Sequence, residues 1–127
     1  MKVLNLEDSI LKHVEIKRAL ERCGATRVDL VTNQEDGMIK IRETLGTELE
    51  YDLIVSDMHY PLKKGVESDT EAGFKLIERL KAEGIKIPII ICSSLRFSEP
   101  GILGTVWYNK TQDIEQDFRD LINKLRQ

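Results

Sequence analysis

The sequence has few of the residues and patterns that mark special classes of protein. Only two of its 127 residues are cysteines, Cys23 and Cys92, and only three are prolines. Two isolated cysteines are too few for a disulfide framework or a zinc site, so we expect both in the core. No apolar run approaches the length of a membrane span, and Met1-Lys2 is followed by only a four-residue run before Glu7-Asp8. We therefore expect no signal peptide, no membrane partner and a cytoplasmic location.

An excess of basic charge is also lacking. The net charge is −3, the pI is about 5.5, and the longest basic run is Lys63-Lys64. Surfaces that bind nucleic acid are usually basic, so we expect no nucleic-acid partner. The length fits a single domain, residues 1–127, with a hydrophobic core, and 41% hydrophobic residues are typical of a globular protein.

Short apolar segments alternate with amphipathic segments along the chain. The predicted strands are residues 2–6, 28–31, 53–55, 89–92 and 105–109, and the predicted helices are residues 9–22, 33–45, 71–82 and 113–125. In the first helix we expect Ile10, Val14, Ile16, Leu20 and Cys23 to face inward. The polar stretch 62–70 is expected to be an exposed loop.

This alternation predicts an α/β fold. Strand–helix–strand units are right-handed and build a parallel sheet that is covered on both faces. Five strands in a small domain indicate a doubly wound, flavodoxin-like sheet of order 2-1-3-4-5. The stretch 95–104 contains Pro100 and two glycines, so the fourth of the five expected helices should be short or degenerate. Ligands of such sheets bind at the carboxyl ends of the strands.

Four predicted strands end at reactive side chains. Glu7-Asp8 follows the first strand, Asp57 the third, Ser93 the fourth and Lys110 the fifth. Crowded carboxylates repel one another, and either a raised pKa or a bound cation relieves the repulsion. Oxygen ligands at a solvent-open site favour Mg²⁺ or Mn²⁺. A metal ion, an ammonium and a hydroxyl together would neutralise a phosphoryl group on Asp57.

In this order and on these elements, the residues resemble the receiver domain of two-component response regulators, of the chemotaxis-regulator type. The resemblance covers essentially the whole chain and implies a stand-alone phosphorelay switch. Asp57 would accept a phosphoryl group from a histidine kinase or a histidine phosphotransfer protein. Asp8, Asp57 and the backbone carbonyl of His59 would bind the metal directly, and Glu7 would act through metal-bound water.

The resemblance also assigns the parts of the switch. Lys110 would contact Asp57 and the phosphoryl group, Ser93 would move toward that group, and Trp107 would be the switch aromatic. The output would be binding to a downstream protein or to a second copy of the chain. Such a domain catalyses only its own phosphorylation and dephosphorylation, so we expect a signalling switch and not a turnover enzyme.

Several features depart from the family pattern. Thr111 stands where the family usually has proline, so we expect a trans bond after Lys110. The stretch from Pro61 to Gly73 is longer than usual, and the stretch from Ser93 to Lys110 is shorter. Ser94 replaces a usual Ala or Gly. Partner recognition is therefore expected to differ from that of the family.

Other interpretations stay open. The chain could be a receiver-like interaction module that does not use phosphorylation, which the missing proline and the shortened stretch favour. It could be a flavodoxin-like cofactor or hydrolase domain, although it lacks a Ser/Thr/Gly-rich phosphate loop after the first strand and a G-x-G-x-x-G motif. Taken singly, Asp57 could begin a turn, Lys110 could be a solvated lysine and Trp107 could be a core residue.

Overall fold

The sheet has the topology that the sequence predicts. A computed structural model describes residues 1–96 and 98–126. Its main sheet pairs every neighbouring strand in parallel, in the order β2-β1-β3-β6-β7. These strands are β1 (Lys2–Leu6), β2 (Arg27–Val31), β3 (Leu53–Ser56), β6 (Ile89–Ser93) and β7 (Gly104–Trp107). The predicted order 2-1-3-4-5 is therefore confirmed, because these five strands are the first to fifth of the predicted sheet.

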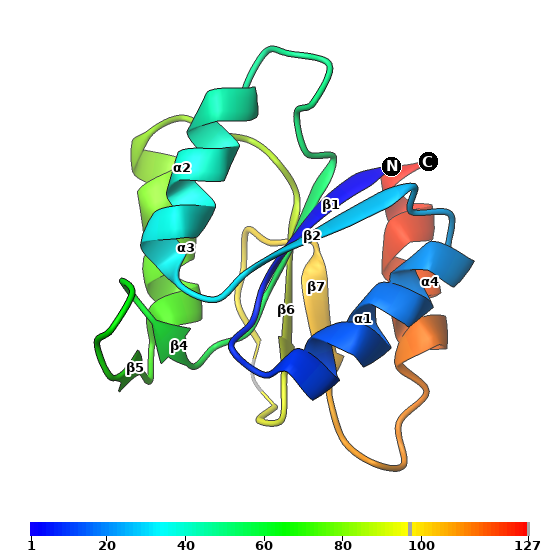
Figure 1. Cartoon of the computed structure of the whole chain (residues 1–127). Helices are drawn as coiled ribbons and strands as arrows, with labels where there is room; N and C mark the ends of the chain where they lie inside the picture. The colour runs from blue at the N-terminus through cyan, green and yellow to red at the C-terminus, as the bar shows by residue number, and fades with distance from the viewer. Residues whose placement is uncertain (97, 127) are drawn as a thin grey trace.

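Two helices cover each face of the sheet. In Figure 1, α2 and α3 lie on one side of the strands and α1 and α4 on the other. The helices are α1 (Ile10–Arg22), α2 (Gln34–Thr44), α3 (Ala72–Ala82) and α4 (Ile114–Leu125). Three begin where a polar side chain accepts a hydrogen bond from a backbone N–H of the first turn, which satisfies a donor that has no partner within the helix. These capping residues are Ser9, Asn33 and Asp113.

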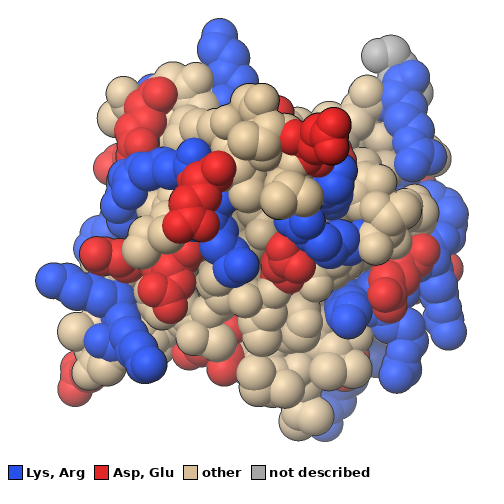
Figure 2. Space-filling model, turned by 45° about the horizontal axis from the view of Figure 1, so that its top comes forward, with Lys and Arg blue, Asp and Glu red and all other residues tan. Residues whose placement is uncertain are grey.

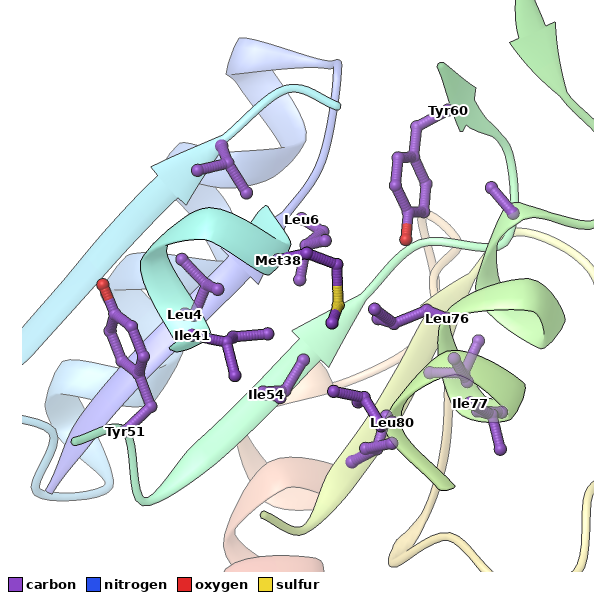
Figure 3. Packing of buried hydrophobic residues seen from close by; sticks show 14 of the residues in the cluster. Leu4, Leu6, Met38, Ile41, Tyr51, Ile54, Tyr60, Leu76, Ile77 and Leu80 are labelled. Carbon is purple, nitrogen blue, oxygen red and sulfur yellow. The ribbon is translucent and has the colours of Figure 1, made fainter. Parts of the chain in front are cut away.

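The core lies in two layers, one on each face of the sheet. Under α2 and α3, apolar side chains of those helices meet side chains of β1 and β3, as Figure 3 shows for Met38, Ile41, Leu76 and Ile54. On the other face, α1 and α4 pack over Val3, Val55, Ile90 and further apolar residues. Both cysteines are buried and free, as expected. The two layers account for a sheet whose central strands are apolar without alternation.

The inward face of α1 differs from the prediction. Its buried residues are Lys12, Ile16, Ala19 and Leu20, whereas Ile10 is 58% exposed and Val14 is 45% exposed. The prediction for Ile10 and Val14 was wrong. The buried set follows the spacing of one helix face, and that face begins with a lysine because carboxylates lie opposite it at the strand ends.

The stretches after β3 and after β6 depart from a simple strand–helix alternation. The predicted loop 62–70 contains part of an antiparallel hairpin, in which β4 (Tyr60–Pro61) pairs with β5 (Ser68–Asp69). Strands of two residues are too short to be recognised by alternation. Between β6 and β7, residues 94–96 and 98–103 contain no helix. The prediction that the helix here is degenerate is confirmed, because none of these described residues is helical.

The surface mixes charges of both signs. On the face shown in Figure 2, Lys and Arg side chains are interspersed with Asp and Glu side chains. The longest helix of the described chain has 13 residues, and none is long and apolar enough to pass through a lipid bilayer.

Candidate functional site

The sheet register places three carboxylates together. Leu6 pairs with both Val31 and Ser56, so β1 and β3 end level with each other. The ladder continues one residue further, because the Asp57 N–H donates to the Leu6 carbonyl at 2.9 Å. One carboxylate oxygen of each of Glu7, Asp8 and Asp57 consequently lies within 4.8 Å of the other two. This is the switch point between the first and third strands, where doubly wound sheets bind ligands.

Lys12 is a site residue that the sequence analysis missed. Its Nζ lies 3.0 Å from Glu7 Oε1 and 3.2 Å from Asp57 Oδ1. It also donates a hydrogen bond of 2.8 Å to the backbone carbonyl of Cys92, at the end of β6. The helix start at Ser9 sets this geometry, since it turns the third helical residue toward the strand ends. The described structure therefore supplies a buried cation to the acidic cluster from α1.

The charges shift the pKa values of the site. Burial raises the pKa of Glu7 from its ordinary value of 4.5 to about 7, against the attraction of Lys12 and with added repulsion from Asp57. Burial alone would lower the pKa of Lys12, but the negative charges around it, Asp57 foremost, outweigh burial and raise it. Lys12 is therefore protonated over the physiological range. The raised pKa of Glu7 is one of the two forms of relief expected for crowded carboxylates, and the Lys12 side chain adds a positive charge that the sequence did not predict.

The raised pKa of Glu7 predicts how stability changes with pH when no divalent ion is bound. Between pH 4.5 and about 7, the folded chain keeps a proton on Glu7 that the unfolded chain has lost. Stability falls with rising pH wherever the folded state binds more protons. We expect the free energy of unfolding, measured by urea denaturation in EDTA, to decrease across this window. Glu7→Gln should flatten the slope and Glu21→Gln, an exposed residue of α1, should not; an unchanged slope in Glu7→Gln would contradict the assignment.

The two oxygens of Asp57 have different surroundings. Oδ1 accepts a hydrogen bond of 2.7 Å from the Met58 N–H and lies beside Lys12. No hydrogen bond from the described residues reaches Oδ2. The Asp57 side chain is 14% exposed. One oxygen is therefore held in place, while the other keeps its lone pairs for a reacting group or a ligand.

Ser93 and Trp107 lie next to each other on neighbouring strands. They are register partners between β6 and β7. Ser93 is buried, and its Oγ accepts a hydrogen bond of 3.2 Å from the Leu95 N–H. Trp107 is half-buried, its Nε1 donates to the Ser94 carbonyl at 3.0 Å, and the Arg96 guanidinium lies 3.9 Å from its ring centroid. The indole is thus fixed against the chain that leaves β6.

Lys110 and His59 lie at the exposed rim. Within residues 1–96 and 98–126, the Lys110 ammonium makes no ion pair, so the structure does not bring it to Asp57. The bond between Lys110 and Thr111 is trans, as expected. Asn109 Oδ1 accepts hydrogen bonds from both the backbone and the side chain of Thr111, which turns the chain just after β7. His59 is exposed, two residues after Asp57.

The hairpin after β3 reaches the acidic cluster. Ser68 of β5 donates a hydrogen bond of 3.3 Å to Asp8 Oδ2. The next residue, Asp69, pairs with Lys75 at the start of α3 at 2.6 Å, which ties the hairpin to the helix. Only the unusual length of this loop could be predicted from the sequence. Its hydroxyl contact with Asp8 depends on a hairpin too short to predict.

A buried network of hydrogen bonds holds the backbone carbonyl of Asp57. Ser56 Oγ donates to the Asp57 carbonyl at 2.8 Å and lies 3.1 Å from the Tyr60 hydroxyl. A hydroxyl carries one proton, so Tyr60 donates to Ser56 when Ser56 donates to Asp57. Gln34 in turn donates to Tyr60 and to the Ala72 carbonyl. These hydrogen bonds link Asp57 through Ser56, Tyr60 and Gln34 to α3. The network therefore fixes the backbone of Asp57 relative to α2 and α3.

Gly73 allows α3 to begin close to the site. A Cβ atom at this position would lie 2.9 Å from the Asp57 carbonyl oxygen and 3.2 Å from Met58 Cα. Both of these atoms belong to the backbone and cannot move aside. The glycine is therefore required for the close packing of α3 against the chain that carries Asp57.

The acidic cluster fits a small divalent cation. Its donors are carboxylate oxygens, which suit Mg²⁺ and Mn²⁺, and Asp8 keeps the cluster open to solvent. Glu7 is 1% exposed, and its Oε1 accepts no hydrogen bond of good geometry, although Lys12 is near. A buried oxygen with such spare capacity is suited to a metal ion or to water bound by one. Glu7, Asp8 and Asp57 are the residues that would hold it.

Solved structures of response regulators share this architecture. The TrrA response regulator of Thermotoga maritima, determined with Mg²⁺ and BeF, is 17% identical, with a TM-score of 0.73 over 98% of this chain and 97% of that one. The Mn²⁺-bound response regulator Rcp1 is 13% identical, with a TM-score of 0.69 over 94% and 90% of the two chains.

The chain has the receiver fold. At these identities the likeness extends to the fold only. The RcsB response regulator of Salmonella typhimurium is a further match, at 17% identity and a TM-score of 0.69. The match covers 99% of this chain but only 59% of that protein. No protein-family model and no curated protein matches the sequence. Within the receiver fold, the described chain differs from the expected pattern by lacking a helix between β6 and β7.

Proposed function

We propose that this chain is a phospho-acceptor switch of the response-regulator type. Asp57 would receive a phosphoryl group from a histidine kinase or a histidine phosphotransfer protein in a phosphorelay. The observation that carries the proposal is the position of Asp57. It stands at the switch point of a receiver fold, within 4.8 Å of Glu7 and Asp8, and one of its oxygens lacks a hydrogen bond from the described residues. The arrangement joins a nucleophile to its charge-neutralising groups.

Different residues of the chain would have different roles in the transfer of the phosphoryl group. Asp57 Oδ2 is the nucleophile, because Oδ1 is held by the Met58 N–H at 2.7 Å. Glu7 and Asp8 would hold Mg²⁺ or Mn²⁺ together with Asp57. When bound, that ion would supply positive charge to the oxygens of the transferred group. The Ser93 hydroxyl, which accepts a bond from Leu95 in this structure, is the donor proposed to turn toward the new phosphoryl group.

The consequence of phosphorylation would be a change of surface and not turnover of a substrate. Trp107 is the register partner of Ser93, so movement of the hydroxyl would disturb the indole and its contact with Ser94. The altered surface would bind a downstream protein or a second copy of the chain. In this proposal the domain catalyses its own phosphorylation and dephosphorylation, in the cytoplasm.

A second candidate function has specific support. Lys110 lies exposed without an ion pair among the described residues, and residues 94–96 and 98–103 contain no helix. These two observations favour a receiver-like interaction module that works without phosphorylation. The same experiment separates the two candidates, because only the first requires an acyl phosphate.

The experiment is incubation of the protein with acetyl phosphate and Mg²⁺, followed by intact-mass measurement. We expect one phosphoryl group per chain, its loss with hydroxylamine, and none in EDTA. A mass that stays unchanged with both acetyl phosphate and a purified phosphohistidine donor would support the interaction module.

A further inference from the structure

The ammonium of Lys12 lies where the ends of the strands meet. It lies 3.0 Å from Glu7 after β1 and 3.2 Å from Asp57 after β3. It donates to the Cys92 carbonyl of β6 at 2.8 Å. Its Nζ also lies 5.2 Å from the ring centroid of Tyr108, just after β7. Groups at the ends of four strands therefore surround one positive charge.

Burial of a lysine lowers the stability of a fold unless other interactions compensate for it. Removing an ammonium from water is unfavourable, and paired carboxylates only partly offset the cost. Most lysines of this chain avoid it by staying exposed, Lys110 among them. Lys12 belongs to the otherwise apolar face of α1, with Ile16, Ala19 and Leu20. Its position is therefore that of a charge held at one place by the fold.

We propose that Lys12 is the catalytic cation that contacts the phosphoryl group as it is transferred to Asp57. This inference rests on the proposed phospho-acceptor function and gives Lys12 the role that the family resemblance assigns to Lys110. Lys12 already touches the carboxylate that becomes the acyl phosphate. The oxygens of an incoming phosphoryl group therefore arrive beside a fixed positive charge, which stabilises the transition state without reorganisation.

With acetyl phosphate as the donor, phosphoryl transfer to Asp57 exchanges one bond between phosphorus and oxygen for another. Asp57 Oδ2 forms a bond to phosphorus, and the bond between phosphorus and the acyl oxygen breaks. The electron pair of that bond leaves with acetate, and no proton is transferred. Lys12 remains protonated throughout and acts only by its charge and its hydrogen bonds.

The position of Lys12 has a second consequence, for metal binding. The ammonium contacts two of the three carboxylates that fit a divalent ion. Like charges that share ligands repel each other, so Lys12 weakens metal binding before phosphorylation. Its removal should therefore slow phosphorylation while it tightens Mg²⁺ binding, and a merely structural lysine would not produce opposite effects on these two quantities.

The test compares Lys12→Met with Lys110→Met and Lys17→Met. Lys17 is exposed on the same helix and controls for loss of charge alone. For Lys12→Met we expect a rate of phosphorylation by acetyl phosphate that is lower by about 100-fold. Calorimetric titration of the unphosphorylated protein should show Mg²⁺ affinity that is about tenfold tighter. Lys17→Met should leave both quantities unchanged. Lys12→Arg, which keeps the charge, should restore most of the rate and the weak metal affinity.

The outcomes distinguish this inference from the proposed function. A wild-type protein that takes no phosphoryl group overturns both. A phosphorylated wild type with an equally fast Lys12→Met variant overturns only the role of Lys12. Loss of the rate in Lys110→Met but not in Lys12→Met has the same meaning. If Lys12→Met does not fold, Lys12→Arg is used in its place. A folded Lys12→Arg variant that takes up no more phosphoryl group than Asp57→Asn likewise overturns the role of Lys12, because the positive charge is retained.

Discussion

Asp57→Asn is expected to abolish phosphoryl incorporation. The amide keeps the size of the side chain but is a poor nucleophile, so no acyl phosphate can form. Because Asn retains a carbonyl oxygen that can accept from the Met58 N–H, the fold should survive the change. Intact mass after incubation with acetyl phosphate and Mg²⁺ is the measurement, and the signal should fall to background.

Asp52→Asn is the matched control for this loss. Asp52 is exposed and precedes β3, at the opposite end of the strand from Asp57. The change removes the same charge next to the same strand, at the end away from the acidic cluster. We expect normal phosphorylation. A phosphoryl signal that persists in Asp57→Asn would mean that another residue is the acceptor and would contradict the account.

Phe118→Ala is expected to lower the free energy of unfolding by about 3–5 kcal/mol. Phe118 is fully buried, at 0% exposure, in the layer where α1 and α4 pack on the sheet. Truncation removes the transfer free energy of the ring and leaves a cavity that rigid strands cannot fill. Urea denaturation monitored by circular dichroism gives the difference, with the single tryptophan as a second probe.

Leu11→Ala controls for the loss of an apolar side chain. Leu11 is 80% exposed on α1, so its removal should change the free energy of unfolding by no more than about 0.5 kcal/mol. Equal effects of the two substitutions would show that the layer between α1, α4 and the sheet is not packed as described.

The order of the strands and the acidic cluster could be predicted from the sequence because each follows from a local signal. Apolar runs ended at Glu7-Asp8, at Asp57 and at Ser93, and parallel pairing brings such ends to one edge. The helix predicted at residues 113–125 is present as α4 (Ile114–Leu125), and its buried residues are Phe118 and Ile122. Pro100 and two glycines indicated the weak helix between the last two strands. In these cases the side-chain pattern and the fold agree.

The role of α1 could not be predicted from periodicity alone. Ile10 and Val14 suggested an apolar face, and a lysine is rarely placed inward. The acids at the strand ends reverse this preference, because they stabilise a buried ammonium. Two signals for an inward Lys12 were present in the sequence. Lys12 lies four residues before Ile16, on the same helical face, and the strand ends carry an excess of acidic residues that a buried ammonium could neutralise. Ser68 gave no such signal, because its approach to Asp8 depends on a hairpin of two-residue strands.

The central claim is that Asp57 becomes an acyl phosphate, and reductive mapping tests it most directly. Borohydride reduces an aspartyl phosphate to homoserine, which peptide mass spectrometry then locates in the sequence. After incubation with acetyl phosphate and Mg²⁺, we predict homoserine at position 57 and at no other aspartate. Homoserine at another position, or unmodified Asp57 in a chain that has gained a phosphoryl group, would contradict the account.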